Sequence, residues 1–310
     1  MPKVSIIVPN YNHNQFLKVR IETILNQTFQ DFEVILLDDC STDCSLEVLN
    51  EYRNHPKVSR LDVNERNSGS TFKQWQKGIE LAKGDLIWIA ESDDWCEPTL
   101  LETLVNAFDM HSNLVLGYVQ SYYIFDKDRI EWVSKQDKLE DIIAGNEFVK
   151  RRLLNGNAIY NASMALFKKS AYHQVPSDYM DFKLCGDWLF WINIALQGDV
   201  FISGKILNYF RNHSQDVSGK SYQSGLNFIE ELKVLFYLCD NNLISNDEFF
   251  EALNIRYLRY RNSTFVYSSD TKKKIDDLFL NDRNTRPYKH KLKQNYLRFR
   301  IRNLLSILRK

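Results

Sequence analysis

Three carboxylates lie within four positions of one another, directly after a short apolar segment. Glu91, Asp93 and Asp94 follow residues 86–90, and an apolar run of that length is typical of a parallel strand covered on both faces. Ligands of open α/β sheets bind just beyond the carboxyl ends of the strands. Because Mg²⁺ is usually held by one or two carboxylates plus substrate phosphates, these residues predict a metal site that holds a diphosphate. The alternative is a polar turn that caps the next helix.

Polar side chains also follow two earlier apolar segments, residues 4–8 and 33–37. These polar positions are Asn10, Tyr11, Asn12, Asp38 and Asp39. If the three segments are neighbouring parallel strands, their polar ends face one crevice. There a carboxylate such as Asp39 can accept hydrogen bonds from a nucleotide base, while Tyr11 can lie against the ring. Taken singly, Asp39 could instead cap a helix and Tyr11 could be a core aromatic. The prediction of a nucleotide site therefore rests on the occurrence of these residues together.

The apolar pattern around these clusters alternates between strand-like and helix-like segments. Strands are expected at 4–8, 33–37, 58–63 and 86–90, with helices between them at 16–25, 41–52 and 71–82. This order predicts a parallel sheet with helices on both faces. Further on, we expect a helix at 98–110, a strand at 114–125, a loop at 127–141, helices at 146–154 and 187–196, short strands at 162–167, 200–202 and 207–210, and only helices from about 225.

Composition excludes several classes of protein. The 310 residues carry no formal net charge, so nothing global indicates nucleic acid. The five cysteines are scattered without a C-x-x-C pair, which argues against a zinc site or disulfide framework and favours a reducing compartment. The N-terminus does not read as a signal peptide, and no apolar run is long enough to span a membrane. We therefore expect a cytoplasmic protein.

Four motifs occur in order: Pro9-Asn10-Tyr11-Asn12, residues 38–43 (DDCSTD), Asn67-Ser68-Gly69 and Glu91-Ser92-Asp93-Asp94. Together they resemble the motifs of inverting family-two glycosyltransferases, which have the glycosyltransferase-A fold. The resemblance covers roughly residues 1–215. It implies that Tyr11 and Asp39 contact the nucleotide base, and that Asp93 holds the metal at the second acidic position of a D-x-D-type motif. Nucleotide-sugar binding is also implied for the remaining motif positions Pro9, Asn12, Asn67, Glu91 and Ser92.

Glu91 departs from the family pattern, because the first acidic residue of that motif is usually Asp. Its side chain is one methylene longer, so its contact near the ribose and the sugar is expected to differ in detail. Cys40 likewise replaces a small residue, and we interpret it as a packed, inert thiol.

An acceptor hydroxyl must lose its proton as it attacks the anomeric carbon, so a general base is needed. A positioned carboxylate contributes roughly 10²–10⁴-fold to such a step. Asp178, Asp181 and Asp187 are candidates, and a plain helix cap is the alternative for Asp187. The resemblance of Gly186-Asp187-Trp188 to the family's catalytic position favours Asp187.

A cationic segment follows the last expected strand. Tyr209-Phe210-Arg211-Asn212-His213 resembles an R-x-x-H-like segment of the family, with Arg211 and His213 one residue closer together than in some relatives. The resemblance implies that these two residues stabilise the leaving diphosphate. A surface loop histidine is the alternative for His213.

The C-terminal stretch 286–310 contains nine Lys or Arg and no acidic residue, with apolar residues interspersed. A basic amphipathic helix of this kind can lie in an anionic membrane interface. The alternative is a helix that packs on the domain and solvates its charged face.

The sequence therefore predicts an α/β protein of glycosyltransferase-A type, with a mostly parallel nucleotide-binding sheet, helices on both faces and a C-terminal helical extension. Residues 1–225 are expected to form the catalytic domain, with a nucleotide-sugar half (1–110) and an acceptor half (111–225). Residues 226–310 would be the helical extension, with membrane contact through 286–310 at the inner face.

The predicted activity is inverting transfer, with Mn²⁺ or Mg²⁺, from a nucleotide-diphosphate sugar to a glycan or lipid-linked acceptor hydroxyl. A UDP-sugar is the favoured donor, and surface polysaccharide or glycan biosynthesis is the implied role. One alternative is a nucleotide-sugar-binding protein without turnover. A sugar nucleotidyltransferase is disfavoured, because no glycine-rich loop follows the first strand.

Overall fold

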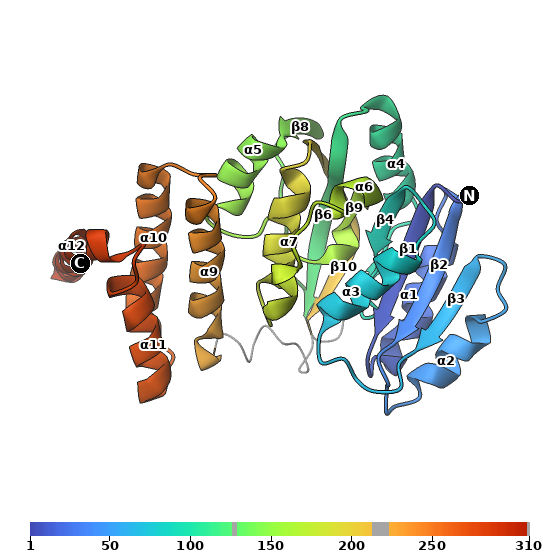
Figure 1. The fold of residues 1–310 in the computed structure, drawn as a ribbon, viewed down its shortest axis with the longest axis horizontal. Coiled ribbons are helices and arrows are strands. Elements are labelled where there is room, and N and C mark those ends of the chain that lie inside the picture. The colour runs from blue at the N-terminus through green and yellow to red at the C-terminus, as the bar shows by residue number, and fades with distance from the viewer. Residues whose placement is uncertain (126–128, 213–222, 309–310) are drawn as a thin grey trace. The chain divides into compact units, whose positions relative to one another are not determined.

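The structure is a computed structural model that describes residues 1–125, 129–212 and 223–308 (Figure 1). The chain forms two compact units. The first comprises Met1–Val149 and Asn157–Ser214, and the second comprises Lys150–Gly156 and Gln215–Lys310. The second unit thus includes one short turn that interrupts the sequence of the first.

The first unit is built on a twisted sheet whose N-terminal part is entirely parallel. The strands are β1 (Val4–Asn10), β2 (Phe32–Asp38), β3 (Val58–Val63) and β4 (Leu86–Ile89), in the spatial order β3-β2-β1-β4. All residues of β1, β2 and β4 are buried, as expected for strands covered on both faces. The predicted parallel sheet is confirmed for this part.

The sheet continues from β4 as a mixed sheet in the order β9-β6-β10-β5. The remaining strands are β5 (Trp95–Cys96), β6 (Leu114–Phe125), β7 (Arg129–Val133), β8 (Glu140–Ala144), β9 (Ala165–Lys168) and β10 (Asp199–Asn212). β9 is antiparallel to both β4 and β6, whereas β10 runs parallel to β6. Beyond the nucleotide half, the sheet is therefore mixed.

Helices cover both faces of the sheet. A Cβ at Gly78 of α3 (Thr71–Leu81) would lie 2.3 Å from the Ile7 side chain, so this helix packs on the Ile7 face of β1 at a distance only glycine allows. Trp88 of β4 pairs with Ile6 and so faces the other way, toward Arg20 of α1 (Asn14–Leu25). The other helices are α2 (Ser45–Tyr52), α4 (Leu100–Met110), α5 (Gly145–Phe148), α6 (Lys169–Tyr172) and α7 (Gly186–Ala195).

Three local predictions differ from the structure. The expected loop at 127–141 contains β7 and the start of β8, which pair with β6 and β10. The two short strands expected at 200–202 and 207–210 are one strand, β10, with register shifts between Ile202 and Asn208. The strand expected at 162–167 starts as a 3₁₀ turn, Ala162–Met164. In each case pairing with a distant strand decides the conformation, and local sequence carries little of that signal.

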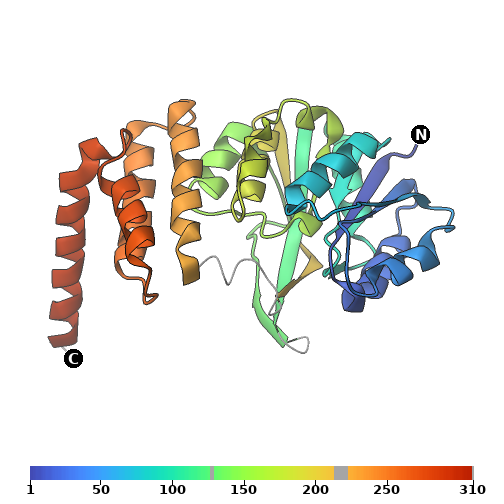
Figure 2. The same cartoon turned by 60° about the horizontal axis from the view of Figure 1, so that its bottom comes forward.

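The second unit consists of helices among its described residues, as predicted from residue 225 on. They are α9 (Leu226–Asp240), α10 (Asn246–Arg261), α11 (Ser269–Leu280) and α12 (Lys289–Leu308), with a 3₁₀ turn at Arg286–Tyr288 and a π-helical turn, Val149–Leu153, shared with the first unit. Figure 2 shows these orange-to-red helices side by side. None of the helices in the described ranges is long and apolar enough to cross a membrane.

Candidate functional site

The three predicted polar clusters follow the carboxyl ends of adjacent parallel strands. β1 lies between β2 and β4, with Asn10 paired to Asp38 and Ile7 paired to Ile89. Parallel strands that are neighbours end at the same edge of the sheet. The clusters after β1, β2 and β4 therefore meet at one edge, where open α/β sheets bind ligands.

The loop after β1 is fastened to the loop after β2. Asn12 has a φ of 58°, and its side-chain oxygen accepts from the Thr42 backbone N–H at 2.7 Å. The Asn12 N–H in turn donates to the Ser41 hydroxyl at 3.0 Å. Pro9 is buried within β1, whereas the Tyr11 ring is 44% exposed. The two loops thus form a frame that presents Tyr11 at the surface.

Asp39 is nearly buried and holds the segment before α3. Its Oδ1 accepts from Asn64 (2.6 Å), the Ser68 backbone N–H (2.9 Å) and Gln74 (2.9 Å), and its Oδ2 accepts from the Ser68 hydroxyl (2.7 Å). The Asn67 amide donates to the Asp39 carbonyl at 3.1 Å. Because Oδ1 already accepts three bonds, a contact from Asp39 to a nucleotide base would have to use Oδ2.

Glu91 accepts a 2.8 Å hydrogen bond from the Trp75 indole N–H, and its own backbone N–H donates to Ser163 at 3.0 Å. Burial and the neighbouring Asp93 charge raise the pKa of Glu91 to about 8. Ser92 is buried, and its hydroxyl lies 2.8 Å from His13 Nδ1. Glu91 and Ser92 are therefore both held by segments distant in sequence.

Asp94 anchors two other segments to this edge. Its Oδ2 accepts from Asn161 at 2.5 Å and from Ser163 at 2.6 Å, while its Oδ1 accepts from the Arg211 backbone N–H at 3.0 Å. Burial and the Asp93 charge raise the pKa of the Asp94 carboxyl, and the fully buried guanidinium of Arg20 opposes that rise. Asp94 is therefore a structural centre of the site.

Arg211 lies beside Asp93. Its Nε donates to the Asp93 carbonyl at 3.0 Å, and its guanidinium carbon lies 4.3 Å from the centre of the Trp95 ring and 4.6 Å from that of Phe16. Two cation–π contacts and a hydrogen bond therefore fix this cation beside the backbone of Asp93. His213 lies outside the described residues.

Asp187 is partly buried in the first turn of α7, where Asn157 donates to its Oδ2 at 2.9 Å. The preceding Gly186 is pressed against other elements, since a Cβ there would lie 2.4 Å from both the Phe72 ring and the Tyr179 carbonyl oxygen. Only glycine lets this turn lie so close to α3. Asn157 is a partner of Asp187 that the sequence did not single out.

Helix α3 connects the separate parts of the site. Gln74 binds Asp39, the adjacent Trp75 binds Glu91, and Phe72 contacts the turn that precedes Asp187. Trp75 also packs on Phe190 of α7, with ring centres 5.5 Å apart. These roles were missed from sequence, where α3 is an ordinary amphipathic helix. The sequence itself offered only the residue types Gln74 and Trp75, and their burial became known from the structure.

The carboxylates at this edge suit a cation whose remaining ligands would be the oxygens of a diphosphate. No group of three or more His, Cys, Asp or Glu side chains in the described chain forms a closed metal site. Asp93 and Glu91 are both partly exposed at the strand end. Because Mg²⁺ needs only one or two carboxylates when phosphates supply other oxygens, these residues fit such an ion.

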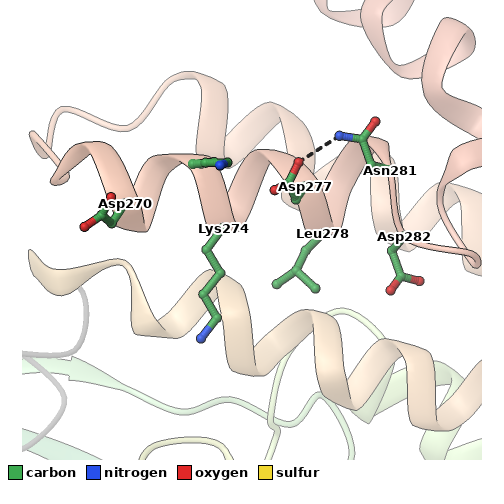
Figure 3. A pocket seen from close by; sticks show the side chains of 7 residues that line it. Asp270, Lys274, Asp277, Leu278, Asn281 and Asp282 are labelled. Atoms are coloured by element: carbon green, nitrogen blue, oxygen red, sulfur yellow. Dashed lines mark hydrogen bonds between the residues drawn. The ribbon is translucent and has the colours of Figure 1, made fainter.

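A hollow of about 480 Å³ lies along α11 in the second unit (Figure 3). Most of its charged side chains are exposed, and Asn281 donates to Asp277 one turn earlier at 2.8 Å. The lining residues are Asp270, Lys273, Lys274, Asp277, Leu278, Asn281 and Asp282. Since they all come from one helix and its end, we assign no chemistry to this hollow.

The sequence model of glycosyl transferase family 2 matches residues 5–175, more than half of the chain. The chain belongs to this family. We call the carboxylates at the ends of β2 and β4, Asp39, Glu91, Asp93 and Asp94, together with their partners the strand-end site. The match includes all four of these carboxylates and stops before Asp187. It confirms the family predicted from the ordered motifs.

Two curated relatives carry glycosyltransferase names. Glycosyltransferase GlyG of Streptococcus pneumoniae is 30% identical over 177 residues, which cover 56% of this chain and 58% of that protein. The poly(ribitol-phosphate) beta-N-acetylglucosaminyltransferase TarS of Staphylococcus aureus is 30% identical over 192 residues, which cover 56% of this chain and 33% of TarS. The chain thus spans between a third and three-fifths of the length of these relatives.

Solved structures share the fold. Staphylococcus aureus TarS in complex with UDP-GlcNAc aligns with a TM-score of 0.58 and 20% identity, over 89% of this chain and 70% of that one. A Pyrobaculum calidifontis mannosyltransferase in complex with GDP-Man and Mn²⁺ aligns with a TM-score of 0.53 and 15% identity, over 96% and 74%. They confirm the predicted glycosyltransferase-A type of fold.

Proposed function

We propose that this chain is an inverting glycosyltransferase that moves a sugar from a nucleotide-diphosphate sugar to an acceptor hydroxyl. The observation that supports this most directly is the role of α3. One helix holds Asp39 through Gln74, Glu91 through Trp75 and the Asp187 turn through Phe72. Side chains proposed for donor binding and for proton transfer are thereby fixed to one rigid element, as catalysis by positioning requires.

The donor would bind across the edge formed by β1, β2 and β4. Exposed Tyr11 would stack on the base, and Asp39 Oδ2 would accept from its edge, with Asn12, Asn67, Ser92 and buried Pro9 shaping the loops around them. A UDP-sugar is the favoured donor. TarS, with the same fold, has been solved with UDP-GlcNAc.

The diphosphate would lie beside Asp93, Glu91 and Arg211. A Mn²⁺ or Mg²⁺ ion held there by Asp93 would act as a Lewis acid on the diphosphate. Arg211, which contacts two aromatic rings, would supply a positive charge where the leaving diphosphate gains negative charge. His213 is proposed for the same role on sequence resemblance alone.

Asp187 would act as the general base. Its carboxylate takes the proton of the acceptor hydroxyl as that oxygen forms a bond to the anomeric carbon. The bond from the anomeric carbon to the diphosphate oxygen breaks, and its electron pair leaves with the nucleotide diphosphate. Attack from the side opposite the leaving group inverts the anomeric configuration. Asn157 would orient Asp187 through their 2.9 Å hydrogen bond.

We assign this chemistry to residues 1–225, with donor binding in 1–110 and acceptor binding in 111–225, and treat 226–310 as a helical extension. A role in building a surface polysaccharide or other glycan is proposed from the named relatives. The acceptor would be a glycan or a lipid-linked saccharide.

The proposal is tested by calorimetry with UDP and Mn²⁺ beside an assay of donor hydrolysis. Binding together with hydrolysis supports an enzyme, and binding without hydrolysis or transfer would identify a nucleotide-sugar-binding protein instead. If Asp187→Asn and Asp93→Ala both kept the wild-type rate, the mechanism would be wrong.

We also propose that α12 rests on the inner face of an anionic membrane. Leu297, Ile301 and Leu305 are each about half exposed or more and recur every four residues, which places them along one side of the helix. Arg298 and Arg302 follow two of them directly and can meet lipid phosphates.

Liposome flotation tests this contact. The wild-type protein should float with vesicles containing phosphatidylglycerol, and less so as salt is raised. The double variant Leu297→Ser, Ile301→Ser should lose flotation, whereas Ile255→Ser, at an exposed position of α10, should keep it. Equal flotation of the wild type and the double variant would end the proposal.

A further inference from the structure

An aromatic cluster lies on the mixed part of the sheet, and only one of its members, Phe210, belongs to a segment used above. We define the Trp132 cluster as Tyr123 of β6, Trp132 of β7, Phe210 of β10 and Tyr160 of the loop before the 3₁₀ turn at Ala162. Tyr123 and Trp132 are stacked at 5.1 Å with planes 13° apart. Tyr160 meets Trp132 edge-on at 4.7 Å, and Phe210 meets Tyr123 edge-on at 5.2 Å.

The cluster is not part of the buried core. Tyr160 is 43% exposed, and Tyr123, Trp132 and Phe210 are each partly exposed. Aromatic rings that only fasten a hairpin gain most by full burial. Tyr and Trp rings with an open surface and a polar group are typical of sites that bind an amphipathic ligand.

Neighbouring tyrosines on β6 belong to two different stacks. Tyr122 stacks on Tyr209, which stacks on Trp95, and Arg211 lies over Trp95. That stack adjoins the proposed diphosphate position. Consecutive side chains of a strand point to opposite faces. Tyr123, and the Trp132 ring stacked on it, therefore lie on the face of β6 opposite to Tyr122.

One short loop joins the Trp132 cluster to the proposed base. Asn157 donates to Asp187, Tyr160 contacts Trp132, and Asn161 donates to Asp94. Three residues of chain span at most about 11 Å, so the Tyr160 backbone lies within that distance of the Asn157 backbone. The cluster is therefore close enough for a molecule that places a hydroxyl at Asp187 to reach it.

We propose that the Trp132 cluster binds a pyranose ring of the acceptor, so that the acceptor is a saccharide. This proposal rests on the function proposed above. The C–H-rich face of a pyranose packs on the electron-rich face of an aromatic ring. Its hydroxyl groups can bond to the Tyr160 hydroxyl and to Asn212, whose amide already donates to the Tyr123 hydroxyl.

Saturation-transfer NMR with a panel of methyl pyranosides, in the presence of UDP and Mn²⁺, tests the occupant. The wild type should transfer saturation to the ring C–H protons of at least one pyranoside. Trp132→Ala and Tyr160→Ala should lose this signal and raise the KM for that acceptor about tenfold, while UDP binding measured by calorimetry is retained. Trp132→Phe should recover most of the signal.

Phe265→Ala provides the matched control, because Phe265 of the second unit is an aromatic residue about as exposed as Tyr160. It should leave both the signal and the KM unchanged. If Trp132→Ala loses its fold, Tyr160→Ala at the more exposed position decides the question. Wild-type signals in Tyr160→Ala, or no saturation transfer from any pyranoside to the wild type, would overturn the proposal. If the wild type itself does not bind UDP in calorimetry, the proposed function is refuted instead.

Discussion

The strand-end site of the first unit and the α11 hollow of the second both combine carboxylates with amides and cations, yet their environments differ. Asp39 and Asp94 are almost fully buried, and each accepts hydrogen bonds from more than one distant segment. In the hollow, Asp277 is exposed and bonded to Asn281 of the next turn. Burying a carboxylate is costly unless its partners are supplied, whereas an exposed pair within a helix is worth a few tenths of a kcal/mol.

The comparison teaches that paired charges alone do not mark a functional site. In the strand-end site, hydrogen-bond donors from distant segments offset the desolvation of the buried carboxylates Asp39 and Asp94. Charge changes there should have large effects, and similar changes on α11 should have small ones.

The sharpest test removes the proposed base. Asp187→Asn keeps the shape of the side chain and its hydrogen bond from Asn157, but it cannot take a proton. We expect kcat for sugar transfer to fall roughly 10²–10⁴-fold, with little change in UDP affinity. Asp181→Asn is the matched control, since Asp181 is exposed and was a rival candidate for this role. A large loss in Asp181→Asn and none in Asp187→Asn would reassign the base.

The second test addresses the proposed metal position. Asp93→Ala should lower kcat/KM for the donor about 10²-fold and weaken the Mn²⁺-dependent gain in UDP affinity measured by calorimetry. EDTA treatment of the wild type should produce a similar loss that added Mn²⁺ restores. Mn²⁺-independent UDP binding and turnover in the wild type would contradict the metal role.

A third test compares two glutamines on one helix. Gln74 is buried and donates to Asp39, whereas Gln76 is partly exposed and donates to Glu80 four residues on. Gln74→Met leaves an Asp39 acceptor short of a partner, so it should destabilise the protein by about 1–3 kcal/mol in urea unfolding and weaken UDP binding. Gln76→Met should change stability by no more than about 0.5 kcal/mol. Equal effects of the two would remove the distinction drawn above.

The smallest effect is expected in the hollow itself. Asp277→Asn removes an exposed charge that accepts a hydrogen bond from Asn281, so stability should change by no more than about 0.5 kcal/mol and transfer should proceed at the wild-type rate. A tenfold loss of transfer in Asp277→Asn would show that the hollow takes part in function and would break the comparison.

Much of the donor side could be predicted from the sequence. Apolar runs that end in polar clusters specify β1, β2 and β4, because strands buried on both faces need continuous apolar residues. The ordered motifs identified the family that the residue 5–175 match confirms. The mixed half was harder, because β7 and the continuous β10 depend on pairing with β6, which is distant in sequence.

By itself, the sequence determined which residue types stand at the strand ends, since local patterning sets where a buried strand stops. Tertiary structure alone decided which of those side chains remain available. Both oxygens of Asp94 accept hydrogen bonds, from Asn161, Ser163 and Arg211. Asp39 Oδ2 accepts only one hydrogen bond, from Ser68, among the described residues and can accept another from a ligand. The physical reason is that a buried carboxylate must find its donors wherever the fold places them, and those donors come from segments that no local pattern connects.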